Sequence, residues 1–337
     1  MSGESESESE SQIRILSAAQ VEQCLNMTDT IDLVRGAMQQ VSRGQCEMPL
    51  RFIVPVGGGN MMGVMPGAMQ EPACYGTKLL SLYPGNPALG LSSHLGGMMV
   101  FDAEFGEPVG LVNAGALTAL RTAAASAVAT DALARADANH LCLIGTGEQA
   151  WSHLEAISAI RPINRLTIAG RTLESVDRFA DQASRAYSSL FFVATDDVEK
   201  AVADADVICT VTSASEPVLY GDWLPDGAHV NAVGASIPTK KEIDVSVVQR
   251  SRTFFDYLPS IMAQAGEIIE GLKSGTLTEQ HLLAEIGAVL NGDADGRLQD
   301  SDVTLYRSMG VAAQDLICAH HVLQVAAQKD IGTIAPF

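Results

Sequence analysis

Residues 141–150, LCLIGTGEQA, place small residues at a spacing that suits a dinucleotide. Gly145, Gly147 and Ala150 form the pattern G-x-G-x-x-A, directly after an apolar strand-like run and at the start of a helix-like segment. The first glycine permits a tight turn, the second lets the backbone approach a pyrophosphate, and the small third residue lets the helix pack on the sheet. Because the pattern has this strand–turn–helix context, it predicts a bound nicotinamide dinucleotide. The same loop contributes the candidate ligands Thr146, Glu148 and Gln149.

The next strand-like run, RLTIAG at 165–170, lacks the acidic residue that usually binds the ribose hydroxyls of NAD. Arg171 and Thr172 follow it instead. A guanidinium and a hydroxyl suit a 2′-phosphate, so this strand end favours NADPH over NADH as the cofactor. A surface arginine without a ligand is the competing interpretation.

Three cations stand in an apolar region that is otherwise poor in basic residues. They are Arg51 in PLRFIVPV, Lys78 in YGTKLLSLY and Arg121 in ALRTAAAS. Buried cations are costly unless they are paired or bind an anion, so these three are candidates for an anionic substrate site. Each of them alone is equally compatible with a structural ion pair or with a head group that reaches solvent.

A small hydroxyl follows another strand-like run, in the segment VNAVGASIP at 230–238. Ser236 comes two residues after Gly234, just beyond the strand end. Ligands of open α/β sheets bind at the carboxyl ends of the strands, which makes Ser236 a candidate for the reacting centre. Serine is also a common turn residue beside glycine.

Two different element patterns surround these residues. From 49 to 114, short strand-like runs are separated at close intervals by Gly, Pro and Asn, which predicts a mostly antiparallel sheet. An alanine-rich segment at 115–135 predicts a long helix. Apolar strands then alternate with helices, which predicts a parallel sheet covered on both faces. Residues 304–328 are expected to form one more long helix.

The fold class expected from these patterns is α/β, with a Rossmann-type doubly wound parallel sheet and a discontinuous α+β domain for substrate binding and dimerisation. The second domain is expected at 13–125 and 305–337, and the nucleotide-binding domain at 126–304. Residues 1–12 are expected to be a disordered acidic tail, because they contain four glutamates and nothing to bury.

Composition excludes several classes of function. A formal charge of −19 opposes binding to nucleic acid or to an anionic membrane surface. The 337 residues contain no secretory signal and no apolar run long enough to span a bilayer. The six cysteines have no metal-like spacing, so no metal is expected and a reducing cytoplasm is the expected compartment.

Taken together, the motifs resemble the ornithine cyclodeaminase/μ-crystallin family from about residue 13 to the C-terminus. The ordered matches are the arginine of PLRF, the lysine of GTKLLS, LTALRTAAASAVA, IGTGEQA, GRTLESVDRFA, NAVGASIP followed by E-I-D, and GRLQDSDVTLYRSMGVAAQDL. The resemblance implies a homodimer whose small-molecule substrate presents a carboxylate to Arg51, Lys78 and Arg121.

The resemblance also implies a larger set of cofactor contacts. Asn231 and Ala232 would lie beside the nicotinamide together with Val233. The remaining expected cofactor-binding residues are Arg121, Thr122, Val211, Thr212, Ser308 and Gly310.

Ser236 distinguishes among the chemistries of this family. Ornithine cyclodeaminases have an aspartate at the corresponding position, and a serine cannot act as a carboxylate base at neutral pH. The resemblance therefore favours NADPH-dependent reduction of a cyclic ketimine, Δ1-pyrroline-2-carboxylate or Δ1-piperideine-2-carboxylate, to proline or pipecolate. Lys78 is the candidate proton donor, and Ser236 is the candidate hydrogen-bond partner of the ring nitrogen. An ornithine cyclodeaminase, an alanine dehydrogenase-like enzyme and a non-catalytic ligand binder are the alternatives.

Overall fold

The computed structural model describes residues 11–337, apart from the side chains of Pro87 and Ala88. The chain divides into two compact units. The first comprises the described residues up to 25 together with 46–118 and 315–337, and the second comprises 26–45 and 119–314. Residues 26–45, 119–125 and 305–314 therefore group with the nucleotide-binding half, whereas the sequence pattern placed them in the other domain. The acidic tail lies outside the described residues except for Ser11 and Gln12, and Gln12 begins the first strand.

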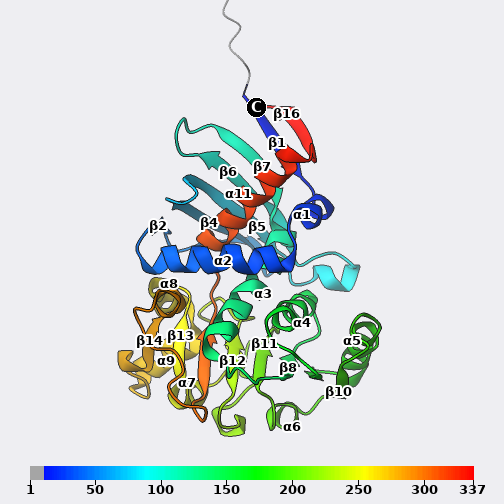
Figure 1. Ribbon diagram of the computed structural model, residues 1–337, viewed down its shortest axis with the longest axis vertical. Helices are drawn as coiled ribbons and strands as arrows, with labels where there is room; N and C mark the ends of the chain where they lie inside the picture. The colour runs from blue at the N-terminus through cyan, green and yellow to red at the C-terminus, as the bar shows by residue number, and fades with distance from the viewer. Residues whose placement is uncertain (1–10) are drawn as a thin grey trace, which may run out of the picture. The chain divides into compact units, whose positions relative to one another are not determined.

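The first unit is built on a sheet whose strand order is β16-β1-β7-β6-β5-β4-β2, with β3 also paired to β4 (Figure 1). The pairs from β2 to β7 are antiparallel, which confirms the predicted antiparallel sheet, and β1 pairs parallel to β7. Its strands are β1 (Gln12–Leu16), β2 (Cys46–Glu47), β3 (Phe52–Gly57), β4 (Asn60–Met69), β5 (Cys74–Leu82), β6 (His94–Asp102), β7 (Pro108–Asn113) and β16 (Thr333–Pro336). Two short helices accompany them, α1 (Ala18–Cys24) and the 3-10 turn η1 (Asn86–Leu89).

Side chains alternate across this sheet as the pleat requires. In β5 the side chains of Cys74, Lys78 and Leu80 are buried, whereas Tyr75 and Leu79 are exposed. One face therefore packs on the core of the unit, and the other presents apolar side chains to the surface.

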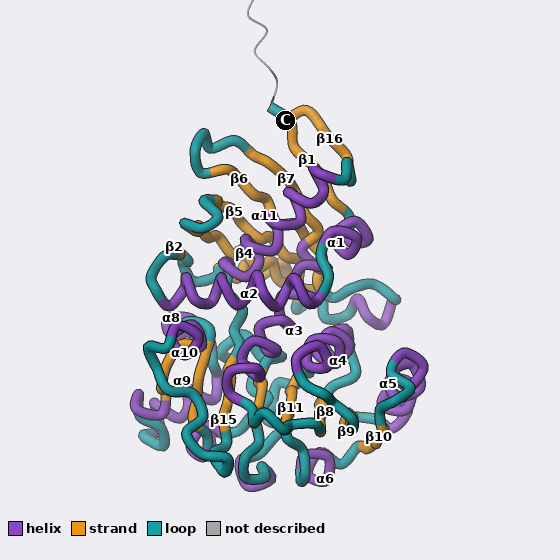
Figure 2. Tube along the Cα trace, in the orientation of Figure 1, coloured by secondary structure: helices purple, strands orange, loops and turns teal. Residues whose placement is uncertain are grey.

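The second unit contains an all-parallel sheet with the order β10-β9-β8-β11-β12-β15-β13-β14 (Figure 2). Its strands are β8 (His140–Ile144), β9 (Arg165–Ala169), β10 (Phe191–Thr195), β11 (Val207–Thr210), β12 (His229–Ala232), β13 (Arg252–Phe255), β14 (Leu282–Glu285) and β15 (Thr304–Arg307). Strand order reverses between β8 and β11, which is the point where a doubly wound sheet binds its ligand. The predicted Rossmann-type fold is confirmed.

Helices cover both faces of the parallel sheet, as its uniformly apolar strands require. The helices that lie wholly in this unit are α2 (Met27–Ser42), α4 (Glu148–Ile160), α5 (Leu173–Ala186), α6 (Val198–Val202), α7 (Val245–Arg250), α8 (Leu258–Gln264), α9 (Gly266–Ser274) and α10 (Ile286–Asn291), with the 3-10 turns η2 (Gly221–Trp223) and η3 (Glu279–His281). Of these, α2 packs on α10 and α4. One buried cluster joins Ile144, Ile208 and Val230 of the strands to Val202 of α6 and Ile268 of α9.

Two long helices have residues in both units. They are α3 (Ala114–Leu133), which contains the boundary at residue 118, and α11 (Ala312–Gln328), which contains the boundary at residue 314. Asn113 caps the N-terminus of α3, since its Oδ1 accepts the Ala116 N–H at 3.0 Å.

The expectation of a single helix over 304–328 was wrong. Residues 304–307 form β15, which is hydrogen-bonded between β12 and β13, and α11 begins only at Ala312. Gly310 has a left-handed φ of +71°, which ends the extended segment in a turn before the helix. Strand pairing across the sheet thus overrode a run of residues that is equally compatible with a helix. Within residues 11–337, no helix has both the length and the apolarity to cross a membrane.

Candidate active site

The glycine fingerprint lies at the switch point of the parallel sheet. Gly145 follows β8 with a left-handed φ of +124°, and its N–H donates to the Ala169 carbonyl at 2.8 Å. A Cβ atom at Gly145 would come within 2.7 Å of the Val211 carbonyl oxygen, so only glycine fits beside the end of β11. The structure thus brings together the ends of three neighbouring strands, β8, β9 and β11.

Gly147 has a different reason to be glycine. A Cβ atom built there would meet no protein atom within 4 Å, so packing inside the protein does not require the missing side chain. Gly147 begins α4, and no side chain caps that helix. An open backbone at an uncapped helix N-terminus suits the close approach of a pyrophosphate.

Two buried oxygens support the same assignment. Thr122 Oγ1 and Gln149 Oε1 have no hydrogen-bond partner in the protein. Buried polar atoms are almost always hydrogen-bonded, so orphan oxygens on two predicted cofactor-binding residues indicate a ligand. Together with the open backbone at Gly147, these residues fit a nicotinamide dinucleotide.

A buried hydrogen bond between Ser126 and His153 joins α3 to α4. His153 Nδ1 bonds the Gln149 carbonyl at 2.7 Å, and His153 Nε2 lies 2.9 Å from Ser126 Oγ. Burial lowers the pKa of His153 to about 4, so the ring is neutral. Nδ1 then donates to the carbonyl and Nε2 accepts from the serine. His153 was missed by sequence reasoning, because a histidine within an amphipathic helix gives no functional signal.

Arg171 and Thr172 lie between the end of β9 and the start of α5. Both residues are exposed. Thr172 Oγ1 accepts the Ser175 N–H and thereby caps α5, so its hydroxyl already has a structural task. A Cβ atom at Gly170 would lie 3.3 Å from Thr146 Cγ2, which places the fingerprint loop next to this strand end.

A buried carboxylate that sequence reasoning did not select ties β11 to β12. Glu242 accepts hydrogen bonds from Thr210 Oγ1 at 3.0 Å, from the Thr212 N–H, and from the N–H groups of Gly234 and Ala235. Burial raises the pKa of Glu242, and these donors act in the opposite direction. These four contacts link the Glu242 carboxyl group to the loops after β11 and β12. The available signal was its place in the pattern NAVGASIP-x-x-x-E-I-D.

The Glu242 carboxylate orders the loops that carry Val211, Thr212, Val233 and Ser236. A Cβ atom at Gly234 would come within 2.2 Å of the Thr212 carbonyl oxygen, which keeps the two loops in close contact. Val211 and Val233 are buried, and Ser236 is half-buried.

Asn231 lies deeper than the resemblance implied. Its side chain is fully buried, and Nδ2 donates to Thr130 Oγ1 of α3 at 2.9 Å. Its Oδ1 lies 3.2 Å from His229 Nε2. The Asn231 side chain therefore joins the sheet to α3 inside the unit.

The loop after β15 contains Ser308 and Gly310, and it lies against Arg121. Asp256, at the end of β13, accepts the N–H groups of Met309 and Gly310 at 2.7 and 2.6 Å. Arg121 Nη1 donates to Gln314 Oε1 at 2.9 Å. A buried ion pair supports the same edge of the sheet, with Arg307 Nε 2.6 Å from Glu267 Oε1.

In the first unit, Lys78 is paired with a carboxylate that sequence reasoning missed. Its Nζ lies 2.7 Å from Asp315 Oδ2, and the side chains are 1% and 0% exposed. Thr118 Oγ1 lies 3.4 Å from the same nitrogen. Loss of either partner would leave a buried charge without its counter-charge. Asp315 gave no separate signal, because an acid in an amphipathic helix usually faces solvent.

Arg51 immediately precedes β3 and is half-buried. The register pairs Phe52 with Val64, and Met65 with Lys78. Continuing the β3–β4 pairing by one residue places Arg51 opposite Met65, on the same face of the sheet as Lys78. No group of three or more His, Cys, Asp or Glu side chains suited to a metal ion occurs among residues 11–337.

The fold and these residues define a class: a dinucleotide-binding α/β protein with a second, discontinuous sheet domain that contains the buried Lys78–Asp315 ion pair. The model of the ornithine cyclodeaminase/mu-crystallin family matches residues 11–330. The chain belongs to this family, which confirms the resemblance seen in its motifs.

Three known proteins illustrate the similarity. A Δ1-pyrroline-2-carboxylate reductase from Bacillus cereus is 31% identical over 325 residues, which is 96% of this chain and 99% of the relative. The ketimine reductase mu-crystallin of Mus musculus is 32% identical over 312 residues, covering 90% of this chain and 94% of that protein. The structure of Thermococcus litoralis Δ1-pyrroline-2-carboxylate reductase with NADH and L-proline is 30% identical, with a TM-score of 0.92 and coverage of 95% and 99%.

Proposed function

We propose that this protein is an NADPH-dependent reductase of cyclic ketimine carboxylates. The reaction adds a hydride to C2 and a proton to the ring nitrogen, so that Δ1-pyrroline-2-carboxylate becomes L-proline, or Δ1-piperideine-2-carboxylate becomes L-pipecolate. The observation that carries the proposal is the cradle formed by Gly145, Gly147 and the orphan oxygens of Thr122 and Gln149. It is supported by full-length relatives that are named for this chemistry.

The residues of this chain supply binding and the proton. NADPH supplies the hydride when it is bound. Arg51 and Arg121 bind the substrate carboxylate, since a guanidinium matches a carboxylate in charge and geometry. Lys78, held by Asp315 at 2.7 Å, is the proton donor to the imine nitrogen, because protonation makes C2 electrophilic. Ser236 hydrogen-bonds the ring nitrogen.

The preference for NADPH rests on Arg171. Its guanidinium is exposed at the strand end where the ribose is expected, and no acid occupies that strand end. Bound NADH in the structure from Thermococcus litoralis belongs to a protein that is 30% identical, so the preference of this chain is a separate question.

A direct assay tests the function. Purified protein is mixed with NADPH and either Δ1-pyrroline-2-carboxylate, Δ1-piperideine-2-carboxylate, or pyruvate with ammonia, and loss of NADPH absorbance is followed. We expect turnover with one or both ketimines and little with pyruvate and ammonia. Release of ammonia from L-ornithine without added reductant would instead identify a cyclodeaminase.

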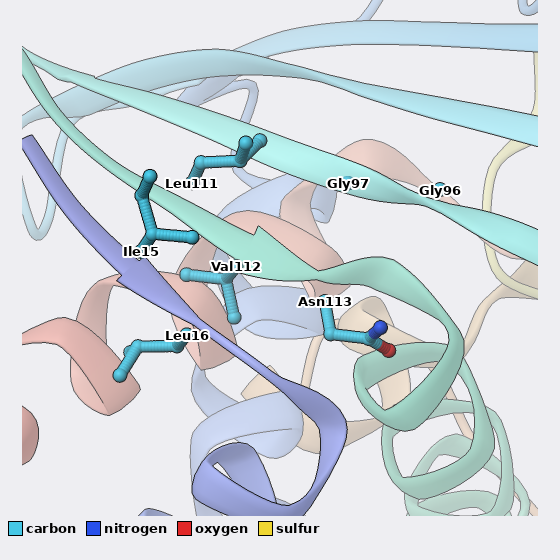
Figure 3. Close-up of a pocket in the computed structure, with 7 residues that line it drawn as sticks. All are labelled: Ile15, Leu16, Gly96, Gly97, Leu111, Val112 and Asn113. Atoms are coloured by element: carbon cyan, nitrogen blue, oxygen red, sulfur yellow. The ribbon is translucent and has the colours of Figure 1, made fainter. Parts of the chain in front are cut away.

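A homodimer is part of the proposal. The sheet of the first unit presents apolar side chains that are more than a third exposed, which is unusual for a sheet face. They include Ile15, Leu79, Leu95, Val109 and Leu111. A cavity of about 220 Å³ opens among Ile15, Leu111 and Gly96 on this sheet, and Asn113 lies at its edge beside the first turn of α3 (Figure 3).

Light scattering tests the dimer. Leu79→Glu places a charge on this apolar face, so we expect it to convert a dimer to a monomer at micromolar concentration. Leu283→Glu, at an exposed leucine in the second unit, is the matched control and should leave the dimer intact. A monomeric wild-type protein would overturn this part of the proposal. A cytoplasmic location also stays a proposal, supported by cysteines that form no disulfide in the described chain.

A further inference from the structure

The turn at Gly310 lies directly against the guanidinium of Arg121. Gly310 has a φ of +71°, and a Cβ atom built on it would lie 2.5 Å from Arg121 Nη1 and 3.1 Å from Nη2. A distance of 2.5 Å is well inside van der Waals contact, so an alanine here cannot coexist with the observed position of Arg121. The space that a side chain at position 310 would need is therefore filled by the Arg121 guanidinium.

The backbone of that turn is held by a buried carboxylate. Asp256 is fully buried at the end of β13, and its Oδ2 accepts the N–H groups of both Met309 and Gly310. Since β13 and β15 are hydrogen-bonded neighbours, Asp256 joins the ends of two adjacent strands. This pair of hydrogen bonds holds the turn at Met309 and Gly310 against the end of β13.

Gln314 contacts the same guanidinium nitrogen that lies nearest to Gly310. Its Oε1 accepts from Arg121 Nη1 at 2.9 Å, and its Nε2 lies 3.3 Å from Met38 Sδ on α2. Gln314 is fully buried, so neither contact is shared with solvent. The amide is thereby oriented with its oxygen toward the arginine.

We propose that Gly310, Asp256 and Gln314 form a seat that aims the Arg121 guanidinium at the substrate carboxylate. The role of Arg121 in carboxylate binding rests on the proposed function, whereas the seat itself rests on the contacts above. Gly310 then acts through Arg121, as a positioning residue for the substrate. This differs from the role expected from the resemblance, in which Gly310 binds the cofactor.

The two roles predict different losses in a Gly310→Ala variant. If Gly310 seats Arg121, the KM for Δ1-pyrroline-2-carboxylate rises at least tenfold, and the Kd for NADPH, measured by fluorescence titration, changes less than twofold. If Gly310 contacts the cofactor, the Kd for NADPH rises with the KM, and that result would overturn the proposal.

Gly275→Ala is the matched control for backbone strain. Gly275 has nearly the same conformation, with a φ of +76°, but a Cβ atom there would meet nothing within 4 Å. Both alanines therefore incur the left-handed strain, and only the one at 310 collides with a guanidinium. We expect Gly275→Ala to keep the wild-type KM.

Two further variants keep the inference testable if Gly310→Ala fails to fold. Gln314→Met removes the acceptor at similar volume and should raise the KM with little change in the Kd for NADPH. In an Arg121→Met background, Gln314→Met should cause no further rise in KM, because its effect passes through the arginine. Additive effects of the two substitutions would contradict the seat.

A crystal structure of Gly310→Ala separates this inference from the proposed function. Displacement of the Arg121 guanidinium away from Gln314 supports the seat, and an unmoved guanidinium overturns it. Failure of the wild-type protein to reduce any ketimine would refute the proposed function, and the crystal structure would still decide whether the seat exists.

Discussion

Lys78 and Asp315 form an ion pair of 2.7 Å in which neither side chain is more than 1% exposed. The two residues are separated by 237 positions in the sequence and belong to the same compact unit. Asp315 follows Gln314 directly in α11, and Gln314 contacts Arg121. Two consecutive residues of one helix therefore each contact a cation that the sequence marked as a substrate ligand.

Breaking the Lys78–Asp315 pair on one side should be strongly destabilising. Asp315→Asn leaves a buried ammonium without its carboxylate, so we expect a loss of about 3–5 kcal/mol in the free energy of unfolding. Urea unfolding measures it. The double variant Lys78→Met with Asp315→Leu should recover much of the stability, though not the activity. Glu174→Gln, in the exposed pair with Arg178, is the control. A loss under 1 kcal/mol for Asp315→Asn would show that the pair is unimportant.

Glu242→Gln should loosen the loops after β11 and β12. An amide nitrogen cannot accept a hydrogen bond, so at least one of the N–H groups of Thr212, Gly234 and Ala235 loses its partner. We expect a loss of about 1–3 kcal/mol in unfolding free energy and a higher Kd for NADPH. Glu270→Gln, at the exposed partner of Lys241, serves as the control. Unchanged cofactor affinity would mean that these loops do not contact the dinucleotide.

Arg171→Ala should change cofactor choice. The guanidinium is expected to bind the 2′-phosphate, so the KM for NADPH should rise about tenfold or more and that for NADH less than twofold. Arg178→Ala removes an exposed arginine from α5, the helix that follows Arg171, and should alter neither value. A wild-type enzyme with a clear preference for NADH would contradict the assignment.

Ser236 can be tested in two directions. Ser236→Ala should lower kcat for ketimine reduction if the hydroxyl hydrogen-bonds the ring nitrogen. Full activity of this variant would mean that Ser236 serves only to form the turn. Ser236→Asp introduces the acid that the family resemblance assigns to ornithine cyclodeaminases at this position. Ammonia release from L-ornithine by that variant would support the view that the missing carboxylate sets the chemistry.

Stability should fall on acidification because two histidines are buried in the neutral form. Burial lowers the pKa of His229 to about 3 and that of His153 to about 4, from an ordinary value of 6.5. Between pH 6.5 and these values the unfolded chain binds protons that the folded chain excludes, so the unfolding free energy decreases as the pH falls. Each histidine should contribute a loss of about 2 kcal/mol between pH 7 and pH 5.

A His229→Gln variant measures that contribution. Its unfolding free energy should be lower at pH 7, but the difference between pH 7 and pH 5 should shrink by about 2 kcal/mol. An unaltered pH dependence in His229→Gln would show that His229 is not the group that titrates.

The sequence alone determined those features of the backbone that depend on only a few neighbouring residues. The turn at Gly145, the helix that starts at Gly147 and the alternating strands follow from backbone sterics and apolar periodicity, which act over a few residues. Lys78 and Arg121 were recognisable because a cation in an apolar stretch requires a partner.

Only the tertiary structure decided which partners those residues have. Asp315 reaches Lys78, and Asp256 reaches the Gly310 turn, from segments that are distant in the sequence, and nothing in their local sequence indicates burial. Glu242 follows the β12 loop closely in the sequence, but its contact with Thr212 spans 30 positions. Residues 304–307 became a strand because the edges of β12 and β13 offered backbone hydrogen bonds on both sides. Strand pairing and burial of charge are non-local, so they depend on where the chain returns in space and cannot be seen in a window of sequence.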